Sequence, residues 1–138
     1  MKTEHELVRS ADENFVASFR KLAQHISGGG TQESDSVFSF VTGLPFALFN
    51  GCVVTGDATT AELAGALEWV ATHGVPFRVW IAEKLAADLE ELPLRHGLER
   101  DSELYPGMAL HPLPDAPELP SGVSLDAVGE PDLGDFRA

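Results

Sequence analysis

Glu62 is the residue whose sequence context bears most directly on chemistry. A carboxylate held beside a substrate amine can accept a proton as a general base. Glu62 also follows Thr59 by three positions, so residues 59–62 have the Thr-x-x-Glu form of a capping box. In that motif the two side chains each satisfy a backbone N–H at the start of a helix. A capping role is therefore the favoured prediction for Glu62, and a catalytic base is the alternative.

The other nucleophilic and basic side chains are scattered along the chain. Cys52 is the single cysteine and lies in an apolar run without a basic neighbour, which predicts a small core residue rather than a nucleophile. Two of the five histidines, His73 and His96, directly precede glycines, where a cation favours the C-terminus of a helix. No Cys/His spacing resembles a zinc site, so no metal is predicted. One cysteine cannot form an internal disulfide, which favours a reducing, cytoplasmic location.

The charge balance excludes two classes of partner. The 138 residues carry 9 Lys and Arg against 22 Asp and Glu, a formal net charge of −13. A nucleic-acid surface needs clustered basic residues, and an anionic membrane repels such a chain. No stretch reaches the length of about 18 apolar residues that a membrane-spanning helix requires. We therefore expect an acidic, soluble protein without a nucleic-acid or membrane partner.

The first half of the chain predicts a helix followed by a β-hairpin. Ser10 and Glu13 form another possible capping box, and apolar residues then recur at helical spacing, which predicts a helix over 11–25. The polar residues 31–36 predict a loop. The runs 37–41 and 46–54 are β-branched and aromatic, and they are predicted to pair as antiparallel strands. Asn50 in the second run is predicted to be a buried amide bonded to backbone, with a ligand contact as the alternative.

The second half predicts alternating helices and strands. A helix follows Thr59 and ends near Gly74, a strand covers 77–82, and a further helix is interrupted by Pro93 and ends at Gly97. Trp69 and Trp80 fit core packing on this helix and strand. Short strands are predicted at 98–104 and 108–110. The fold class is α/β (α+β): a mixed sheet in which an antiparallel hairpin precedes a βαβαβ unit, with helices on both faces.

The predicted domain covers residues 1–111. Prolines at 112, 114, 117 and 120 make residues 112–122 an extended linker. Residues 123–138 form an extension in which 123–128 is typical of a new strand and 130–136 of the first turns of a helix.

Three segments carry a family resemblance. Residues 67–81 (LEWVATHGVPFRVWI) resemble the part of the GNAT-type N-acetyltransferases in which the acetyl-CoA-binding helix leads into the next parallel strand. Residues 92–100 (LPLRHGLER) resemble the element that closes the last helix of that fold, and 105–110 (YPGMAL) the end of the first half of tandem GNAT proteins. The resemblance covers roughly residues 10–111. It implies that 123–138 begins a second GNAT unit.

The family's cofactor site is poorly matched. Its phosphate-binding turn has the form R/Q-x-x-G-x-G/A, in which glycines and free N–H groups at a helix N-terminus hold the diphosphate. The corresponding residues 56–63 lack that pattern and place Asp57 and Glu62 near the expected phosphates. If coenzyme A binds, the backbone of Val53, Val54 and the turn at Gly56 would hold it.

The family's catalytic acid is also missing. Many members place a tyrosine four residues before the glycine that closes the last helix, where it can protonate the leaving thiolate. Here that position is Pro93. Tyr105, the single tyrosine, lies beyond the helix and is the remaining candidate for this role.

Three functions follow from these observations. The first is a degenerate GNAT-like domain that binds no cofactor by itself and forms the structural or substrate-shaping half of an acetyltransferase, with a catalytic GNAT half as partner. The second is an active acetyl-CoA-dependent N-acetyltransferase acting on a small cationic amine, which an acidic surface would attract. The third is an interaction module that associates with a second copy of itself, as a dimer, through an exposed strand edge.

Overall fold

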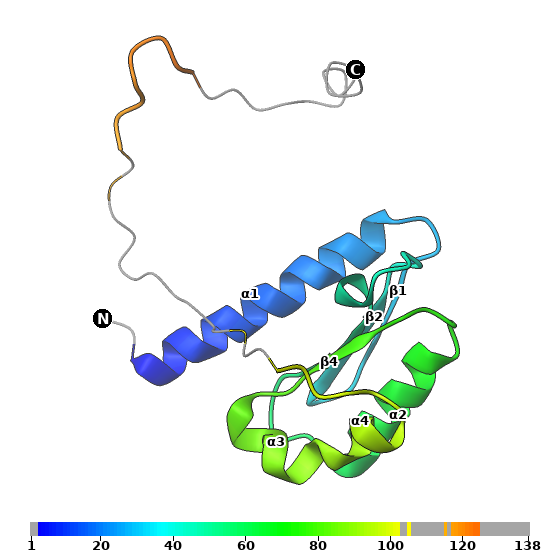
Figure 1. Ribbon diagram of the computed structural model, residues 1–138. Coiled ribbons are helices and arrows are strands. Elements are labelled where there is room, and N and C mark those ends of the chain that lie inside the picture. Colours follow the sequence, from blue (N-terminus) through cyan, green and yellow to red (C-terminus); the bar gives the residue numbers. More distant parts are fainter. Residues whose placement is uncertain (1–2, 103–104, 106–114, 116, 125–138) are drawn as a thin grey trace.

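The computed structural model describes residues 3–102, 105, 115 and 117–124. The element order is α1 (Glu4–His25), β1 (Gly30–Glu33), β2 (Val37–Val41), η1 (Ala47–Phe49), β3 (Gly51–Val54), α2 (Thr60–Ala71), β4 (Arg78–Trp80), α3 (Glu83–Leu89) and α4 (Glu91–Arg95). Figure 1 shows the α1 helix lying along one side of the sheet and the helices α2, α3 and α4 on the opposite side. The fold class is therefore α+β.

The sheet has four strands in the order β1-β2-β3-β4. β1–β2 and β2–β3 are antiparallel, whereas β3–β4 is parallel. The parallel pair needs the crossover that α2 supplies. The predicted hairpin and the following β3–α2–β4 unit are thus confirmed. The last strand of the predicted βαβαβ unit, expected at 98–104, is not formed by its described residues 98–102.

The α1 helix begins seven residues earlier than predicted, at Glu4 rather than residue 11. Its N-cap is Thr3, whose hydroxyl accepts from the Glu6 N–H at 3.3 Å while the Glu6 carboxylate accepts from the Thr3 N–H at 2.7 Å. The predicted capping box at Ser10 is wrong because that residue lies inside the helix. Two equivalent motifs occur in series, and the helix starts at the first.

Residues 31–36 are not all loop, because β1 (Gly30–Glu33) pairs with β2. Its burial pattern is that of an edge strand with exposed side chains, so its residues carry no apolar alternation that would reveal it. The predicted strand over 46–54 is also shorter than expected: residues 47–49 form the 3-10 helix η1, and β3 begins at Gly51. A Cβ on Gly51 would overlap the carbonyl of Arg78, so only glycine lets β3 approach β4 this closely.

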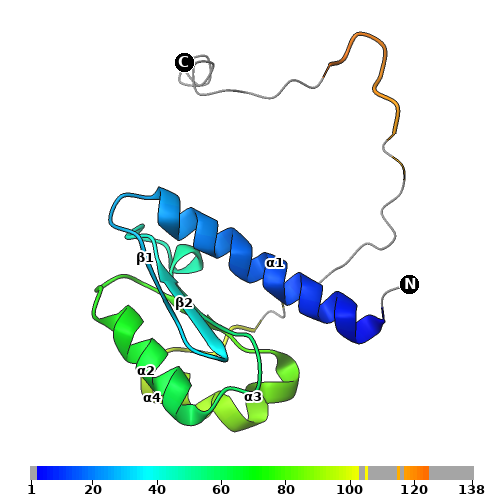
Figure 2. The ribbon, with the colours of Figure 1, turned by 180° about the vertical axis from the view of Figure 1, so that it is seen from behind.

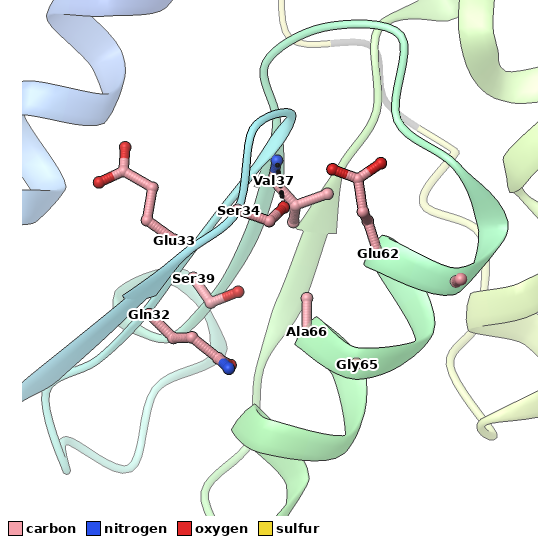
Figure 3. A pocket seen from close by; sticks show the side chains of 9 residues that line it. Gln32, Glu33, Ser34, Val37, Ser39, Glu62, Gly65 and Ala66 are labelled. Atoms are coloured by element: carbon pink, nitrogen blue, oxygen red, sulfur yellow. Dashed lines mark hydrogen bonds between the residues drawn. The ribbon is translucent and has the colours of Figure 1, made fainter.

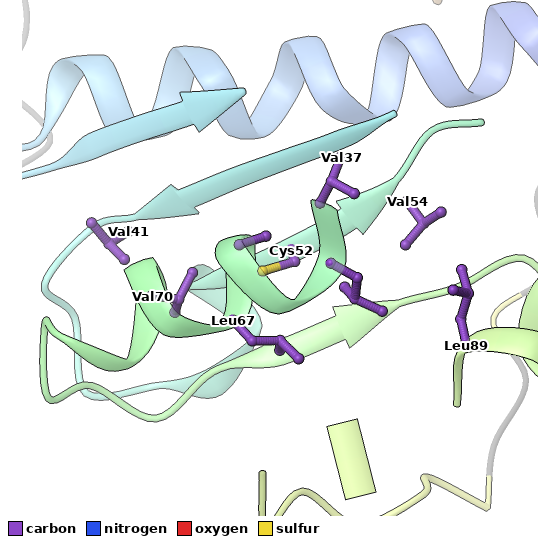
Figure 4. Packing of buried hydrophobic residues seen from close by; sticks show 9 residues of the cluster. Val37, Val41, Cys52, Val54, Leu67, Val70 and Leu89 are labelled. Atoms are coloured by element: carbon purple, nitrogen blue, oxygen red, sulfur yellow. The ribbon is translucent and has the colours of Figure 1, made fainter. Parts of the chain in front are cut away.

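The two faces of β2 serve two separate hydrophobic clusters. Val37 and Val41 belong to the cluster beneath α2, while Phe38 and Phe40 belong to the cluster beneath α1. Figure 4 shows the first cluster, in which Cys52 and Val54 of β3 and Leu89 of α3 also take part. Figure 2 shows from behind the helices that cover these two faces, α1 on one side of the sheet and α2, α3 and α4 on the other. Helices on both faces of the sheet were predicted, and they account for the wholly buried side chains of β2.

Several predictions concern the C-terminal part of the chain. Residues 98–102 contain no strand in the described part of the chain, so that part of the predicted strand at 98–104 is wrong. The predicted strand at 108–110 and most of the extension at 123–138 lie outside the described residues. The described linker residues 115 and 117–122 have no helix or strand. None of the helices in the described chain is long and apolar enough to cross a membrane.

Candidate functional site

The N-terminus of α2 is occupied by its own carboxylate. The Thr59 hydroxyl accepts from the Glu62 N–H at 3.2 Å and donates to Glu62 Oε2 at 2.8 Å, and the same oxygen accepts from the Thr59 N–H at 2.9 Å. This reciprocal arrangement confirms the predicted capping box. The place at which a helix offers N–H groups to a phosphate therefore holds a fixed negative charge.

The pKa of Glu62 is lowered, which keeps this charge in place. The backbone N–H of Thr59 makes the largest contribution to this lowered pKa, followed by the Thr59 hydroxyl. Smaller contributions from the Ser34 side chain and the Ser36 backbone, in the turn between β1 and β2, lower the pKa further. A carboxylate held by so many donors is a poor proton acceptor. The geometry therefore favours the capping role of Glu62 over that of a general base.

The backbone that was predicted to hold coenzyme A lies inside the sheet. Val54 belongs to the cluster beneath α2 and Val53 to the cluster beneath α1, and both side chains are buried. The next N–H, of Thr55, donates to the Ser36 carbonyl at 2.9 Å. The backbone of these residues belongs to the β2–β3 pairing and to the hydrogen bond that continues it. It therefore does not form an open site for coenzyme A.

The turn at Gly56 is closed in a similar way. The Gly56 carbonyl accepts from the Ala58 N–H at 2.8 Å. A Cβ built on Gly56 would lie 3.4 Å from Ser36 Oγ. The space beside this glycine is therefore taken by a serine side chain, whereas a phosphate-binding turn uses its glycines to leave room for the ligand.

A shallow hollow of about 210 Å³ lies between α2 and the β1–β2 hairpin. Figure 3 shows that Gln32, Ser34 and Ser39 approach it from the hairpin and that Glu62 stands at its rim. Small residues on α2 leave the space open, because a Cβ on Gly65 would meet nothing within 4 Å. The lining is Gln32, Glu33, Ser34, Val37, Ser39, Ala61, Glu62, Gly65 and Ala66.

The hollow combines hydrogen-bonding side chains with one carboxylate at its rim. Glu33 is directed away from it, as Figure 3 shows, and pairs with Arg20 at 2.6 Å. Glu62 is the carboxylate that remains. The hollow suits a small ligand that donates hydrogen bonds, and it offers no cationic group to an anion.

The sequence did not reveal this hollow. β1 was predicted as a loop, so nothing indicated that Gln32 and Ser34 face a helix. The available signal was the pair of small residues Ala61 and Gly65, four positions apart on α2. Residues at that spacing lie on one face of a helix, and small side chains leave space on that face.

Tyr105, the predicted substitute acid, lies at the other end of the β3–β4 pair from Glu62. Its hydroxyl accepts from Arg78 Nη1 at 2.8 Å, and its ring centroid is 5.9 Å from the guanidinium carbon. Asp101 pairs with the same guanidinium at 3.6 Å. Arg78 pairs with Gly51 at the start of β3, whereas Glu62 follows the end of that strand. The structure therefore does not bring the two predicted catalytic candidates together.

Cys52 and Asn50 are structural. Burial raises the pKa of the Cys52 thiol to about 11, and a hydrogen bond from the Ser39 hydroxyl opposes this only in part. Asn50 is fully buried, its amide oxygen accepts from the Thr42 N–H at 2.8 Å, and its amide nitrogen donates to backbone carbonyls. Both predictions, a core cysteine and a backbone-bonded asparagine, are confirmed.

The predictions for His73, Trp69 and Trp80 are also tested by their contacts. His73 Nδ1 lies 2.9 Å from the Trp69 carbonyl in the last turn of α2, so it donates there and acts as a C-terminal cap. Trp69 packs against the cluster beneath α2, and Trp80 against the cluster beneath α1. Within the described residues, no three His, Cys, Asp or Glu side chains gather to hold a metal ion.

No protein-family model, curated protein or solved structure matches this chain.

Proposed function

We propose that this chain is a GNAT-like domain that does not transfer acetyl groups by itself and serves as the structural or substrate-shaping half of an acetyltransferase. The observation that carries the proposal is the capping box at α2. In the proposed fold, the helix after the central strand must offer free N–H groups to a diphosphate. Here Glu62 takes the Thr59 N–H, and its negative charge repels the ligand from that helix end.

The arrangement of the strands supports the comparison with a GNAT fold. Antiparallel strands lead into β3, and the α2 crossover then brings β4 parallel to it. Val53 and Val54 are buried, and Tyr105 lies at the far end of the β3–β4 pair. The topology is retained in this proposal, while the groups that would bind the cofactor and protonate its thiolate are replaced.

Calorimetry with acetyl-CoA tests the absence of cofactor binding. Neither the full chain nor the Glu62→Gln variant is expected to show saturable heat. The variant still lacks an open binding site at Val53, Val54 and Gly56. The variant Glu68→Gln, which alters the exposed side of the same helix, is the matched control. Micromolar binding by the unaltered chain would refute the proposal.

The existence of a catalytic half is tested separately. If the reading frame continues past residue 138, the proposal expects a segment of the form R/Q-x-x-G-x-G/A to follow. Adding the present chain to that catalytic part is then expected to change the kcat/KM of the catalytic part for an amine substrate. An unchanged kcat/KM would contradict the substrate-shaping role.

One observation favours a second candidate function, an active acetyltransferase acting on a small cationic amine. The Glu62 carboxylate stands at the rim of the hollow, where it can attract an ammonium group. A thiol-release assay with acetyl-CoA and a panel of polyamines and aminoglycosides tests it. Turnover that disappears in Glu62→Gln and persists in Glu68→Gln would support this candidate over the first.

A further inference from the structure

The hollow between α2 and the β1–β2 hairpin has the size of a small organic molecule. Its volume is about 210 Å³. A protein cavity of about 150 Å³ accepts benzene, and by the same measure this hollow takes roughly eight non-hydrogen atoms. Aminoglycosides and long polyamines are larger than that. The volume therefore restricts the part of a ligand that the hollow can enclose to a short chain or a single small ring.

The hairpin side of the hollow accepts hydrogen bonds. Ser39 of β2 is 1% exposed, and Figure 3 shows its oxygen directed toward α2. The Ser39 hydroxyl donates its hydrogen to Cys52 Sγ at 3.6 Å, which leaves the lone pairs of the oxygen as acceptors. Gln32 of β1 also lines the hollow, and its amide oxygen is a second acceptor. A ligand group that donates hydrogen bonds can therefore be held on this side.

The helix side of the hollow carries a negative charge. Glu62 binds Thr59 through Oε2, and a carboxylate has lone pairs for about four hydrogen bonds, so it can accept another from a ligand. The lowered pKa of Glu62 keeps this group ionised. In the described part of the chain, the ion pairs of Lys and Arg involve other carboxylates. A ligand ammonium group would therefore meet no competing cation at Glu62.

Apolar side chains line the space between the hairpin and the helix. Val37 of β2 and Ala66 of α2 are both buried and both contact the hollow. Gly65 leaves room beside them, since a Cβ at this position would meet nothing within 4 Å. Methylene groups placed here would be removed from water. The hollow thus combines acceptors on one side, a carboxylate on the other side and apolar contacts in the space that they enclose.

We propose that the hollow binds a short linear diamine, with one ammonium group at Glu62 and the other at Gln32 and Ser39. The alkyl chain of the diamine packs against Val37 and Ala66. The inference rests on the proposed function for its role, because a substrate-shaping half has to hold the amine substrate, and it names the class of amine. The binding itself requires neither acetyl-CoA nor a catalytic group. The net charge of −13 attracts any such cation to the protein, and the size of the hollow selects the short ones.

An NMR titration of the isotope-labelled full chain with 1,4-diaminobutane, at constant pH and ionic strength, tests the proposal. The amide signals of Gln32, Ser39 and Gly65 are expected to shift and to reach saturation. n-Butylamine has the same alkyl chain but a single ammonium group. It should bind roughly tenfold more weakly, because it lacks one charge-assisted contact.

Three variants locate the binding in the hollow. Gly65→Leu should abolish it, because a side chain at this position enters the hollow without displacing another group. Glu62→Gln should weaken it roughly tenfold by removing the carboxylate. Glu68→Gln removes the same charge from the exposed side of α2, so it is the matched control and should leave the affinity unchanged. Gly65→Leu retains the capping box and stays informative if Glu62→Gln loosens the start of α2.

Shifts that fail to saturate, or an affinity that Gly65→Leu does not change, would overturn the proposal. Equal losses of affinity in Glu62→Gln and Glu68→Gln would also overturn it, since they would show only a general attraction to the acidic surface. These outcomes are separate from the calorimetry with acetyl-CoA. Failure of the diamine to bind rejects this inference alone, whereas binding of acetyl-CoA rejects the proposed function and leaves the titration result as it is.

Discussion

Replacing Asn50 should destabilise the protein far more than its single amide group would lead one to expect. The side chain is 0% exposed. Its oxygen accepts from the Thr42 N–H at 2.8 Å, and its nitrogen lies 2.9 Å from the Leu44 carbonyl and 3.1 Å from that of Pro76. The amide thus joins the loop after β2 to the segment before β4, although the two lie far apart in the sequence.

The expected cost follows from the groups that Asn50→Ala would leave without a partner. Thr42 is itself 2% exposed, so water cannot replace the lost acceptor for its N–H. A buried polar group that loses its partner costs about 1–3 kcal/mol. Counting the Thr42 N–H and one of the part-buried carbonyls, each at that cost, we expect a loss of about 2–6 kcal/mol. Asn50→Asp should be at least as damaging, because a carboxylate cannot donate to the carbonyls.

Urea unfolding of the full chain, followed by tryptophan fluorescence and circular dichroism, measures this loss. Asn14→Ala on the exposed face of α1 is the control, and it should stay within about 0.5 kcal/mol of the unaltered protein. An Asn50→Ala variant that loses less than about 1 kcal/mol, with an unchanged slope, would show that the loops do not depend on the amide.

Three further outcomes can be measured. The lowered pKa of Glu62 means that its contribution to folding is complete above the ordinary carboxyl pKa and is lost as the pH falls through the lower folded value; urea midpoints should therefore fall less in Glu62→Gln than in the unaltered chain between pH 6 and pH 3. With its pKa raised to about 11 by burial, the Cys52 thiol should resist iodoacetamide at pH 8 and react only as fast as the protein unfolds, a result that equal native and unfolded rates would contradict. Gly51→Ala should cost about 3 kcal/mol or more because its Cβ meets the Arg78 carbonyl, whereas Gly65→Ala, whose Cβ meets nothing within 4 Å, should stabilise α2 by roughly 0.5–1 kcal/mol.

Elements with strong local signals could be predicted from the sequence. α2 was found because Thr59 and Glu62 form a capping box and apolar residues follow at helical spacing. β2 was found because all of its residues are buried between two layers and its sequence is accordingly almost wholly apolar. The roles of Cys52 and Asn50 were also predictable, since each lies in an apolar run without another charged or polar group to act on.

Features that depend on distant partners could not be predicted. β1 is an edge strand whose side chains are largely exposed, so only its pairing with β2 identifies it. The start of β3 at Gly51 depends on the carbonyl of Arg78, which is remote in the sequence. The hollow beside Glu62 combines residues from β1, β2 and α2. In each case the feature depends on a contact between segments that are distant in the sequence, so no local sequence pattern predicts it.

Because β2 is buried on both faces, it couples the unfolding of the two helix layers. Phe38 and Phe40 support α1, while Val37 and Val41, their immediate neighbours in the chain, support α2. If either helix layer detaches, one face of β2 becomes exposed to water. The other layer depends on the same strand and is therefore destabilised as well. Heat or denaturant should therefore melt both layers in a single cooperative transition, and a change on either side of this strand will be felt through the whole domain.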